Sequence, residues 1–182
     1  MAVRARFLCV VATDSVAYTE EGLVAIGATV VDLKTREIHH GPMTEFRMTI
    51  ATTVQPKDRW WLERPELLEY FQRTGRPLAA VRTALQNYWT GLAFALGGEY
   101  FDCMINGSYQ QPTWNALVDH PMWIDSYVFK DMERLFRTHR DLVNQDPEVW
   151  GLGSAEENKV LKIHDPLATA RVTALAIIKD LR

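Results

Sequence analysis

Residues 7–32 read FLCVVATDSVAYTEEGLVAIGATVVD, and this stretch decides the fold class. Phe7–Ala12 is a continuous apolar run rich in valine, which is typical of a strand buried on both faces. A polar segment, Thr13–Glu21, separates it from a second run of valine and alanine, Gly22–Asp32. The stretch therefore predicts two neighbouring strands at the start of a sheet.

The segment that follows extends the same sheet. Residues 32–37, DLKTRE, are a turn signal, and Glu45–Ala51 alternates as a third strand does. Because a short turn joins antiparallel neighbours, we expect these three strands to form an antiparallel meander.

Helical periodicity replaces the strand pattern from Asp58 onward. It predicts one helix up to Gly75 and a longer one over Leu78–Leu96, which two glycines end. Farther along, the sequence predicts a strand, Tyr100–Ile105, and three helices: one that starts at Pro112, one over Lys130–Leu142, and a last one after Asp165. This order is typical of a single α/β domain over residues 1–182, with a mixed sheet flanked by helices.

The composition limits the class of protein. Of 182 residues, 47% are hydrophobic and 24% are charged, which fits one globular domain. The formal net charge of −3 is not the basic signature of a nucleic-acid-binding protein. Cys9 and Cys103 lie in apolar runs, so we expect buried, reduced thiols. No apolar run in the sequence approaches the ~18 residues of a membrane span, and we expect a cytoplasmic protein with no membrane contact.

Segments along nearly the whole chain resemble one enzyme family. They read VAIGATVVD at 24–32, RWWLERPELLEYF at 59–71, CMINGSYQQPTWNALV at 103–118 and HDPLATARVTALAIIKDL at 164–181. In this order they resemble the DEDD (DnaQ-like) 3′–5′ exonucleases of the ribonuclease H-like fold, especially bacterial and phage members. The resemblance implies that fold. For an active member it also implies hydrolysis with two bound Mg²⁺ or Mn²⁺ ions.

The family's four metal-binding acids correspond to positions that hold no acid in this chain. These positions are Val11, Thr13, Thr113 and Thr169, whereas the family's catalytic histidine corresponds to His164. Hard divalent cations bind carboxylate oxygens, and valine and threonine carry no negative charge. We therefore expect no metal or other cofactor, and a catalytically inactive exonuclease-like protein that serves as a binding or adaptor module for protein or nucleic acid.

Two other functions stay open. An active metal-dependent 3′–5′ exonuclease would use His164 as its base and shifted metal ligands drawn from Asp14, Asp102, Asp165, Glu20 and Asp119. A structural or assembly protein would use the fold as a scaffold. In an inactive protein, Asp14 is expected to serve a turn or cap, Asp165 to cap the last helix, and His164 to have a structural role.

Two groups of side chains are candidates for binding. An exposed tryptophan, Trp60 or Trp61, next to Arg64 would stack on a base or anchor a protein interface. The second group is a basic helix face with interleaved acids, for which a solvated surface is the simpler interpretation: Lys130, Arg134 and Arg137. The net charge favours a protein partner or self-association, and single-stranded nucleic acid is the alternative ligand.

Overall fold

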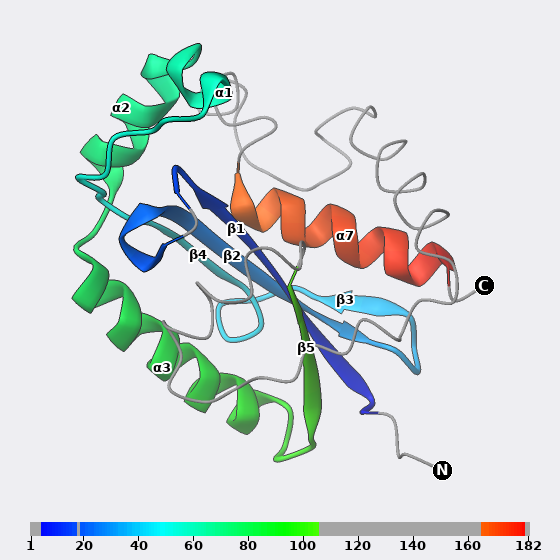
Figure 1. Cartoon of the computed structure of the whole chain (residues 1–182). Helices are drawn as coiled ribbons and strands as arrows, with labels where there is room; N and C mark the ends of the chain where they lie inside the picture. The colour runs from blue at the N-terminus through cyan, green and yellow to red at the C-terminus, as the bar shows by residue number, and fades with distance from the viewer. Residues whose placement is uncertain (1–4, 18, 106–164, 181–182) are drawn as a thin grey trace.

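Two long antiparallel strands form the centre of the sheet (Figure 1). The computed structural model describes residues 5–17, 19–105 and 165–180. In it, β1 (Phe7–Ser15) pairs with β2 (Leu23–Asp32), which follows a single 3₁₀ turn, η1 (Glu20–Gly22). Every residue of β2 is buried. The two strands predicted from residues 7–32 are thereby confirmed.

The third predicted strand, Glu45–Ala51, is observed as the shorter β4 (Phe46–Thr49), and a short strand that was not predicted, β3 (Glu37–His39), precedes it. Both β3 and β4 pair antiparallel with β2, β3 with its end and β4 with its middle. A loop between them is closed by Thr44, whose hydroxyl donates a hydrogen bond to the His39 carbonyl at 2.6 Å. The antiparallel meander is confirmed, with β3 as an additional short strand that the sequence analysis did not predict.

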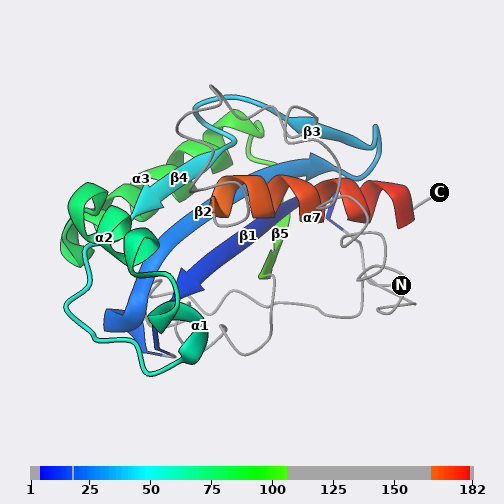
Figure 2. The same cartoon turned by 90° about the horizontal axis from the view of Figure 1, so that it is seen from above.

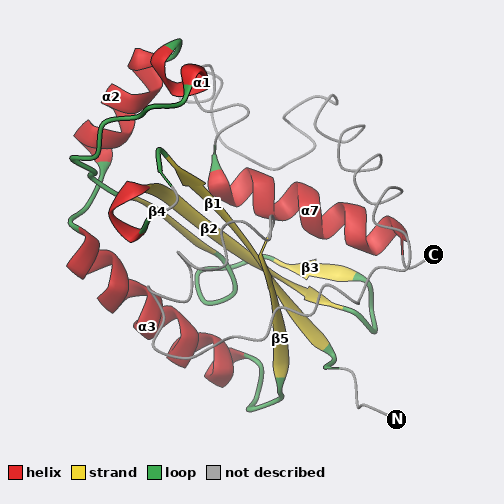
Figure 3. Ribbon diagram, in the orientation of Figure 1, coloured by secondary structure: helices red, strands yellow, loops and turns green. Residues whose placement is uncertain are grey.

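The last described strand makes the sheet mixed. β5 (Phe101–Ile105) pairs parallel with β1, so the strand order is β3-β2-β1-β5, with β4 also on β2. Figure 3 shows these strands lying between the helices. The register places Cys9 directly beside Cys103, and both are buried and free, as expected.

The two faces of the sheet carry different helices. Alternate side chains of a strand point to opposite faces. Cys9 and Val11 of β1 pack in one core cluster with α3 (Leu78–Ala95). Leu8 and Val10 pack in another with α7 (Pro166–Asp180), and Figure 1 shows the strands between these helices. We call these surfaces the α3 face and the α7 face of the sheet.

A third cluster covers the end of β1. The helix predicted from Asp58 to Gly75 is two helices, α1 (Arg59–Leu62) and α2 (Pro65–Thr74). The break follows from Pro65, since a proline disfavours the helical conformation in the residue before it. Figure 2 shows β1 ending beside α1. There Trp61 packs with Leu67 and Phe71.

The remaining predicted elements have separate outcomes. The helix over Leu78–Leu96 and the last helix after Asp165 are confirmed as α3 and α7. The helices predicted at Pro112 and Lys130–Leu142 lie outside the described residues. Within the described ranges, no helix is both long and apolar enough to cross a membrane.

Candidate functional site

The N-terminus of α7 sits on a row of residues that crosses the sheet. In this row Ala12 of β1 pairs with Gly27 of β2, and Gly27 pairs with Arg47 of β4. Directly opposite residues point to the same face, and Ala12 follows Leu8 and Val10 on the α7 face. A Cβ atom on Gly27 would collide with the backbone nitrogen of Leu167. Glycine is therefore required here, because the start of the helix occupies the space of a side chain.

Asp165 is the capping residue of α7, as predicted from the sequence. Its Oδ1 accepts hydrogen bonds from the backbone N–H groups of Leu167 at 2.9 Å and Ala168 at 3.1 Å. Its Oδ2 forms an ion pair with Nε of Arg47 at 2.6 Å. Asp165 is only 4% exposed, so this carboxylate is buried with both of its oxygens bound to protein donors.

Asp14 brings a second carboxyl group to the same region. It lies two residues after Ala12 on β1 and therefore on the α7 face. Burial, and secondly the negative charge of Asp165, raise the pKa of Asp14 from 3.8 to about 7. Since carboxyl groups in water ionise near pH 4, Asp14 is unusual in being only about half ionised at neutral pH.

Thr169 lies one helical turn beyond Asp165. Its hydroxyl donates to the backbone carbonyl of Asp165 at 3.2 Å, and its own carbonyl accepts from the Thr173 hydroxyl at 2.9 Å. Bonds of this kind serve the helix itself. The position expected to hold an acid in an active enzyme thus holds a side chain that bonds its own helix.

The expected positions on β1 do not face this region. Val11 is fully buried in the core cluster of the α3 face, and Thr13 follows it at the strand's period of two. Val11 and Thr169 consequently lie on opposite faces of the sheet and cannot belong to one site. The physical reason is strand periodicity, because a shift of one residue exchanges the faces. The residues of β1 that face α7 here are Ala12 and Asp14.

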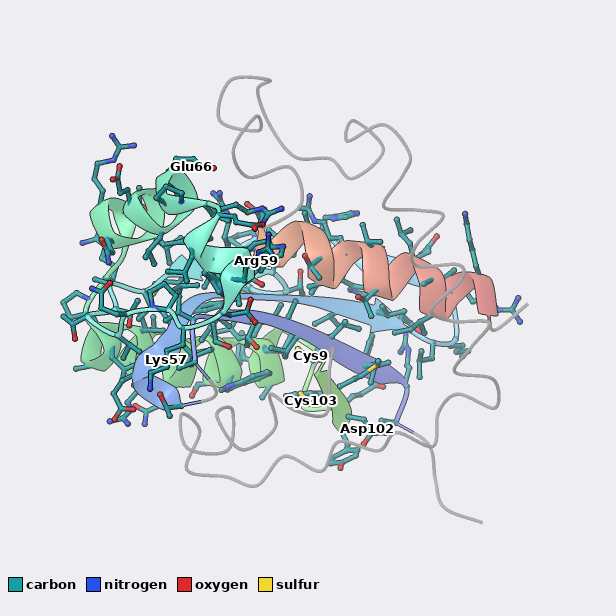
Figure 4. All side chains as sticks on the ribbon, turned by 45° about the horizontal axis from the view of Figure 1, so that its top comes forward. Cys9, Lys57, Arg59, Glu66, Asp102 and Cys103 are labelled. Atoms are coloured by element: carbon teal, nitrogen blue, oxygen red, sulfur yellow. The ribbon has the colours of Figure 1, made fainter. Side chains whose placement is uncertain are left out.

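Asp102, considered as a shifted ligand, lies away from the other two acids. It pairs with Leu8, six residues before Asp14 (14 − 8 = 6), which corresponds to ~20 Å along the strand. Figure 4 labels Asp102 on β5 and Arg59 on α1, the helix beside the end of β1. The structure therefore brings Asp14 and Asp165 together without Asp102.

The side chain of Glu20 is not described, and the remaining candidate positions lie outside the described residues. Outside the described ranges are Thr113, Asp119, Lys130, Arg134, Arg137 and His164.

The donors that are described do not fit a two-ion site. Residues 5–17, 19–105 and 165–180 contain no group of three or more His, Cys, Asp or Glu side chains that could hold a metal ion. A magnesium or manganese pair needs several free carboxylate oxygens. Asp14 is partly protonated at neutral pH, and Asp165 already binds Arg47 and the start of α7.

The two adjacent tryptophans have different roles. Trp61 is buried, and its Nε1 donates to the carbonyl of Ser15 at 3.0 Å, which attaches α1 to the end of β1. Trp60 is half-buried, and the Arg64 guanidinium lies 4.4 Å from the centre of its ring. Nη1 of Arg64 also donates to the Trp60 carbonyl at 2.9 Å. Trp60 and Arg64 thus form a cation–π pair next to Trp61, which contacts the last residue of the strand that carries Asp14.

Two contributors to this region were missed from the sequence. Arg47 was taken only as part of a third strand, and Gly27 as part of a second. The strand alternation that places Ala12 and Asp14 on one face was available in the sequence. The contact of Arg47 with Asp165 was not, because it depends on how β4 pairs with β2 and where α7 begins.

The arrangement of the chain is similar to that of solved exonuclease structures. The sequence matches no protein-family model and no curated protein. The nuclease domain of 3′hExo, a DEDDh family member, bound to rAMP, is 12% identical, with a TM-score of 0.59 over 96% of this chain and 91% of that chain. A full-length 3′-exonuclease is 12% identical, with a TM-score of 0.55 over 97% and 82%.

A third similar structure shows 3′-end specific recognition of histone mRNA stem-loop by 3′-exonuclease. It is 11% identical, with a TM-score of 0.56 over 97% of this chain and 82% of that chain. At these identities the likeness concerns the fold. It confirms the predicted ribonuclease H-like architecture, a mixed sheet flanked by helices.

Proposed function

We propose that this chain is a catalytically inactive member of the DEDD exonuclease type that acts as a binding or adaptor module. The observation that carries this proposal is the state of Asp165. Both of its oxygens are bound to protein donors, one to the start of α7 and one to Arg47. The guanidinium group supplies the positive charge that a metal ion would otherwise bring to this carboxylate.

The neighbouring positions support the same proposal. Ala12 offers no metal ligand, and Thr169 bonds its own helix. A two-ion reaction needs one ion to generate hydroxide and another to stabilise the leaving oxygen. Asp14 alone cannot hold two such ions, so we infer that the ancestral site has lost hydrolysis.

The favoured ligand for the site region is a single-stranded nucleic acid, held without cleavage. The Trp60–Arg64 pair beside the end of β1 offers a ring for base stacking together with a positive charge. The similar structures include one bound to rAMP and one that recognises a histone mRNA stem-loop. A protein partner, which the net charge of −3 favours, is the alternative.

An active exonuclease is the second candidate function, because Asp14 and Asp165 are close enough for their charges to interact. It would require Asp165 to leave Arg47 and the helix cap. The cytoplasmic location and the single domain over residues 1–182 stay predictions. The two free, buried thiols, Cys9 and Cys103, support the cytoplasmic location.

The proposal is tested with labelled single-stranded RNA and DNA in the presence of Mn²⁺. Each sample is divided between a native gel, which reports binding, and a denaturing gel, which reports shortening. Binding without shortening is expected. Shortening that Asp14→Asn or His164→Ala abolishes would contradict the proposal, and neither binding nor shortening, with a mass that rises with concentration, would favour a scaffold.

A pair of variants locates the bound strand. Trp60→Ala should weaken binding about tenfold, because stacking of one base on an aromatic ring contributes ~1–3 kcal/mol. Tyr100→Ala is the matched control, since Tyr100 is an exposed aromatic residue just before β5. Equal affinity of the two variants would show that Trp60 does not contact the bound strand.

A further inference from the structure

Arg47 reaches solvent on the α7 face of the sheet. On β4 it lies between Phe46 and Met48, which pack against the core cluster of the α3 face. Since alternate residues of a strand point to opposite faces, the Arg47 side chain points to the α7 face. Its Nε pairs with Asp165 there, and 44% of the side chain is exposed. The arginine is thus anchored by the protein at one nitrogen while it remains open to solvent.

The guanidinium group of Arg47 has donors that the protein does not use. An arginine carries its N–H donors in a planar fork, and most of them belong to the terminal nitrogens Nη1 and Nη2. The ion pair with Asp165 uses Nε. Within the described residues, Nη1 and Nη2 of Arg47 form no hydrogen bond. Neighbouring nitrogens of this fork match two oxygens of a phosphate group, so arginine binds phosphate bidentately.

The carboxyl groups near Arg47 oppose an anion only weakly, because each of them is compensated. Asp165 has Arg47 itself and the start of α7 as partners. Glu45, two residues before Arg47, accepts hydrogen bonds from Nε and Nη2 of Arg171 at 2.7 and 2.8 Å. The raised pKa of Asp14 leaves that group partly protonated at neutral pH. An anionic ligand at Arg47 therefore meets a region in which the charges are nearly balanced.

The ion pair also holds the guanidinium in position. Asp165 is buried, and its other oxygen accepts hydrogen bonds from the backbone N–H groups of Leu167 and Ala168. The carboxylate is therefore fixed to the start of α7, and it fixes the arginine in turn. A long side chain that is already ordered loses less conformational entropy when it binds a ligand. Arg47 is consequently a preformed donor for an anion.

We propose that Arg47 binds a phosphodiester group of a single-stranded nucleic acid through its terminal nitrogens while its Nε stays on Asp165. The guanidinium then joins a carboxylate to a phosphate, which is the connection that a metal ion makes in an active nuclease. A guanidinium does not generate hydroxide from water as a bound metal ion does, so the strand is held without being cut. This inference rests on the proposed function and names the chemical group that the site recognises.

The position of Arg47 separates a strand from free phosphate as the ligand. Arg47 is on β4, which β2 separates from β1, so Arg47 and the end of β1 are at least two strand spacings apart, or ~10 Å. Trp60 lies beside the end of β1, next to Trp61. A strand that contacts Arg47 and Trp60 gains affinity from both, whereas inorganic phosphate contacts Arg47 alone. Inorganic phosphate should therefore displace the strand only weakly, and equal affinity of the two would overturn the assignment to a strand.

A change in the ligand backbone tests the contact directly. Uncharged methylphosphonate linkages are placed one at a time along a short single-stranded DNA, and the affinity of each DNA is measured with the wild type and with Arg47→Gln. Glutamine still offers an N–H donor to Asp165 but carries no charge. One linkage should weaken wild-type binding about tenfold, the size expected for hydrogen bonds to a charged group. Arg47→Gln should bind the native strand about tenfold more weakly and should not respond to that linkage.

The salt dependence of binding gives a second readout. Each phosphate contact of a single strand contributes about −0.7 to the slope of log affinity against log salt concentration. Arg47→Gln should therefore reduce the steepness of this slope by about 0.7. A purely structural role of Arg47 would lower the affinity without this change in slope, and that result would overturn the inference.

Arg36→Gln is the matched control, because it removes the same charge from the exposed turn that follows β2. Asp32, where β2 ends, is five residues from Gly27 (32 − 27 = 5), which corresponds to ~17 Å along the strand. The control should keep the wild-type affinity and the sensitivity to the same linkage. Urea denaturation confirms that both variants are folded.

The outcomes separate this inference from the proposed function. A linkage whose change weakens binding equally in the wild type and in Arg47→Gln would overturn the inference and leave the proposed function standing. An equal loss of affinity in Arg36→Gln and Arg47→Gln would do the same. A wild type that binds no strand would overturn both.

Discussion

Arg47 and Asp165 form an ion pair in which Nε and Oδ2 are 2.6 Å apart, and this pair joins β4 to the first turn of α7. The aspartate is almost fully buried, whereas the arginine is 44% exposed. The carboxylate that begins α7 is therefore neutralised by the protein itself. In a metal site without its ion, the carboxylate oxygens would be free to bind a cation, whereas here Asp165 is already paired with Arg47.

Replacing the arginine should lower stability. Arg47→Ala leaves the buried Asp165 carboxylate without its charged partner, and we expect the free energy of unfolding to fall by about 1–2 kcal/mol. Urea denaturation at neutral pH measures the change. Arg59→Ala is the control, because Arg59 pairs with Glu63 at an exposed position and should contribute less than ~0.5 kcal/mol. Equal losses in the two variants would show that the Arg47–Asp165 pair contributes no more to stability than an exposed ion pair does.

Asp14 should make stability depend on pH in an unusual direction. Its pKa is about 7 in the folded chain and near 3.8 in the unfolded chain, so between these values the folded state holds one more proton. The free energy of unfolding should therefore fall as pH rises from 4 to 7. Asp14→Asn removes this pH-dependent contribution to stability. The variant should therefore be more stable than the wild type at pH 8 by about 1–3 kcal/mol, but not at pH 4.

The control for Asp14 is a direct titration. Carboxyl carbon shifts measured by NMR should give a midpoint near pH 7 for Asp14, and Asp165→Asn should lower it, since the charge of Asp165 contributes to the rise. An ordinary midpoint near pH 4 would contradict both the burial of this group and its interaction with Asp165.

Gly27 should not tolerate a side chain. Gly27→Ala places a Cβ atom against the backbone of Pro166 and Leu167 and must push α7 away from the sheet. We expect a loss of about 1–3 kcal/mol in the free energy of unfolding. Chemical denaturation gives this value, and a normal stability would mean that α7 does not begin on Gly27.

Gly91 should respond in the opposite way to the same substitution. Gly91→Ala adds a methyl group in open space and removes the flexibility of glycine from a helix interior. The free energy of unfolding should rise by about 0.5–1 kcal/mol, measured by urea denaturation. A loss instead would show that a methyl group at position 91 meets packed atoms rather than open space.

The strands and the long helices could be predicted because their signals are local. The apolar runs of β1 and β2 have no competing interpretation, and Asp165 before Pro166 signals a helix start. The break between α1 and α2 was also readable, since Pro65 stands in the middle of the predicted helix. The short strand β3 could not be predicted, because its three residues become a strand only by pairing with the end of β2.

The candidate site was harder to predict, because it depends on the face of each side chain. The resemblance assigned the family's first acid to Val11, whereas Ala12 is the residue that faces α7. This shift of one residue exchanged the two faces of β1, so Asp14 was not recognised as lying on the same face as Asp165. Arg47 and Asp165 are far apart in the sequence and meet only through the sheet and α7. The sequence already showed that position 169 of the last helix holds a threonine instead of the family's acid. In the structure the Thr169 hydroxyl donates a hydrogen bond to the backbone carbonyl of Asp165 in the same helix.

A titration with Mn²⁺ tests the central claim most directly. Electron paramagnetic resonance of free Mn²⁺, measured with and without the protein at neutral pH, counts the bound ions. The loss of the metal site predicts that the wild type and Asp14→Asn leave the same amount of Mn²⁺ free, with no tightly bound ion on either. Two ions bound tightly to the wild type and released by Asp14→Asn would contradict it.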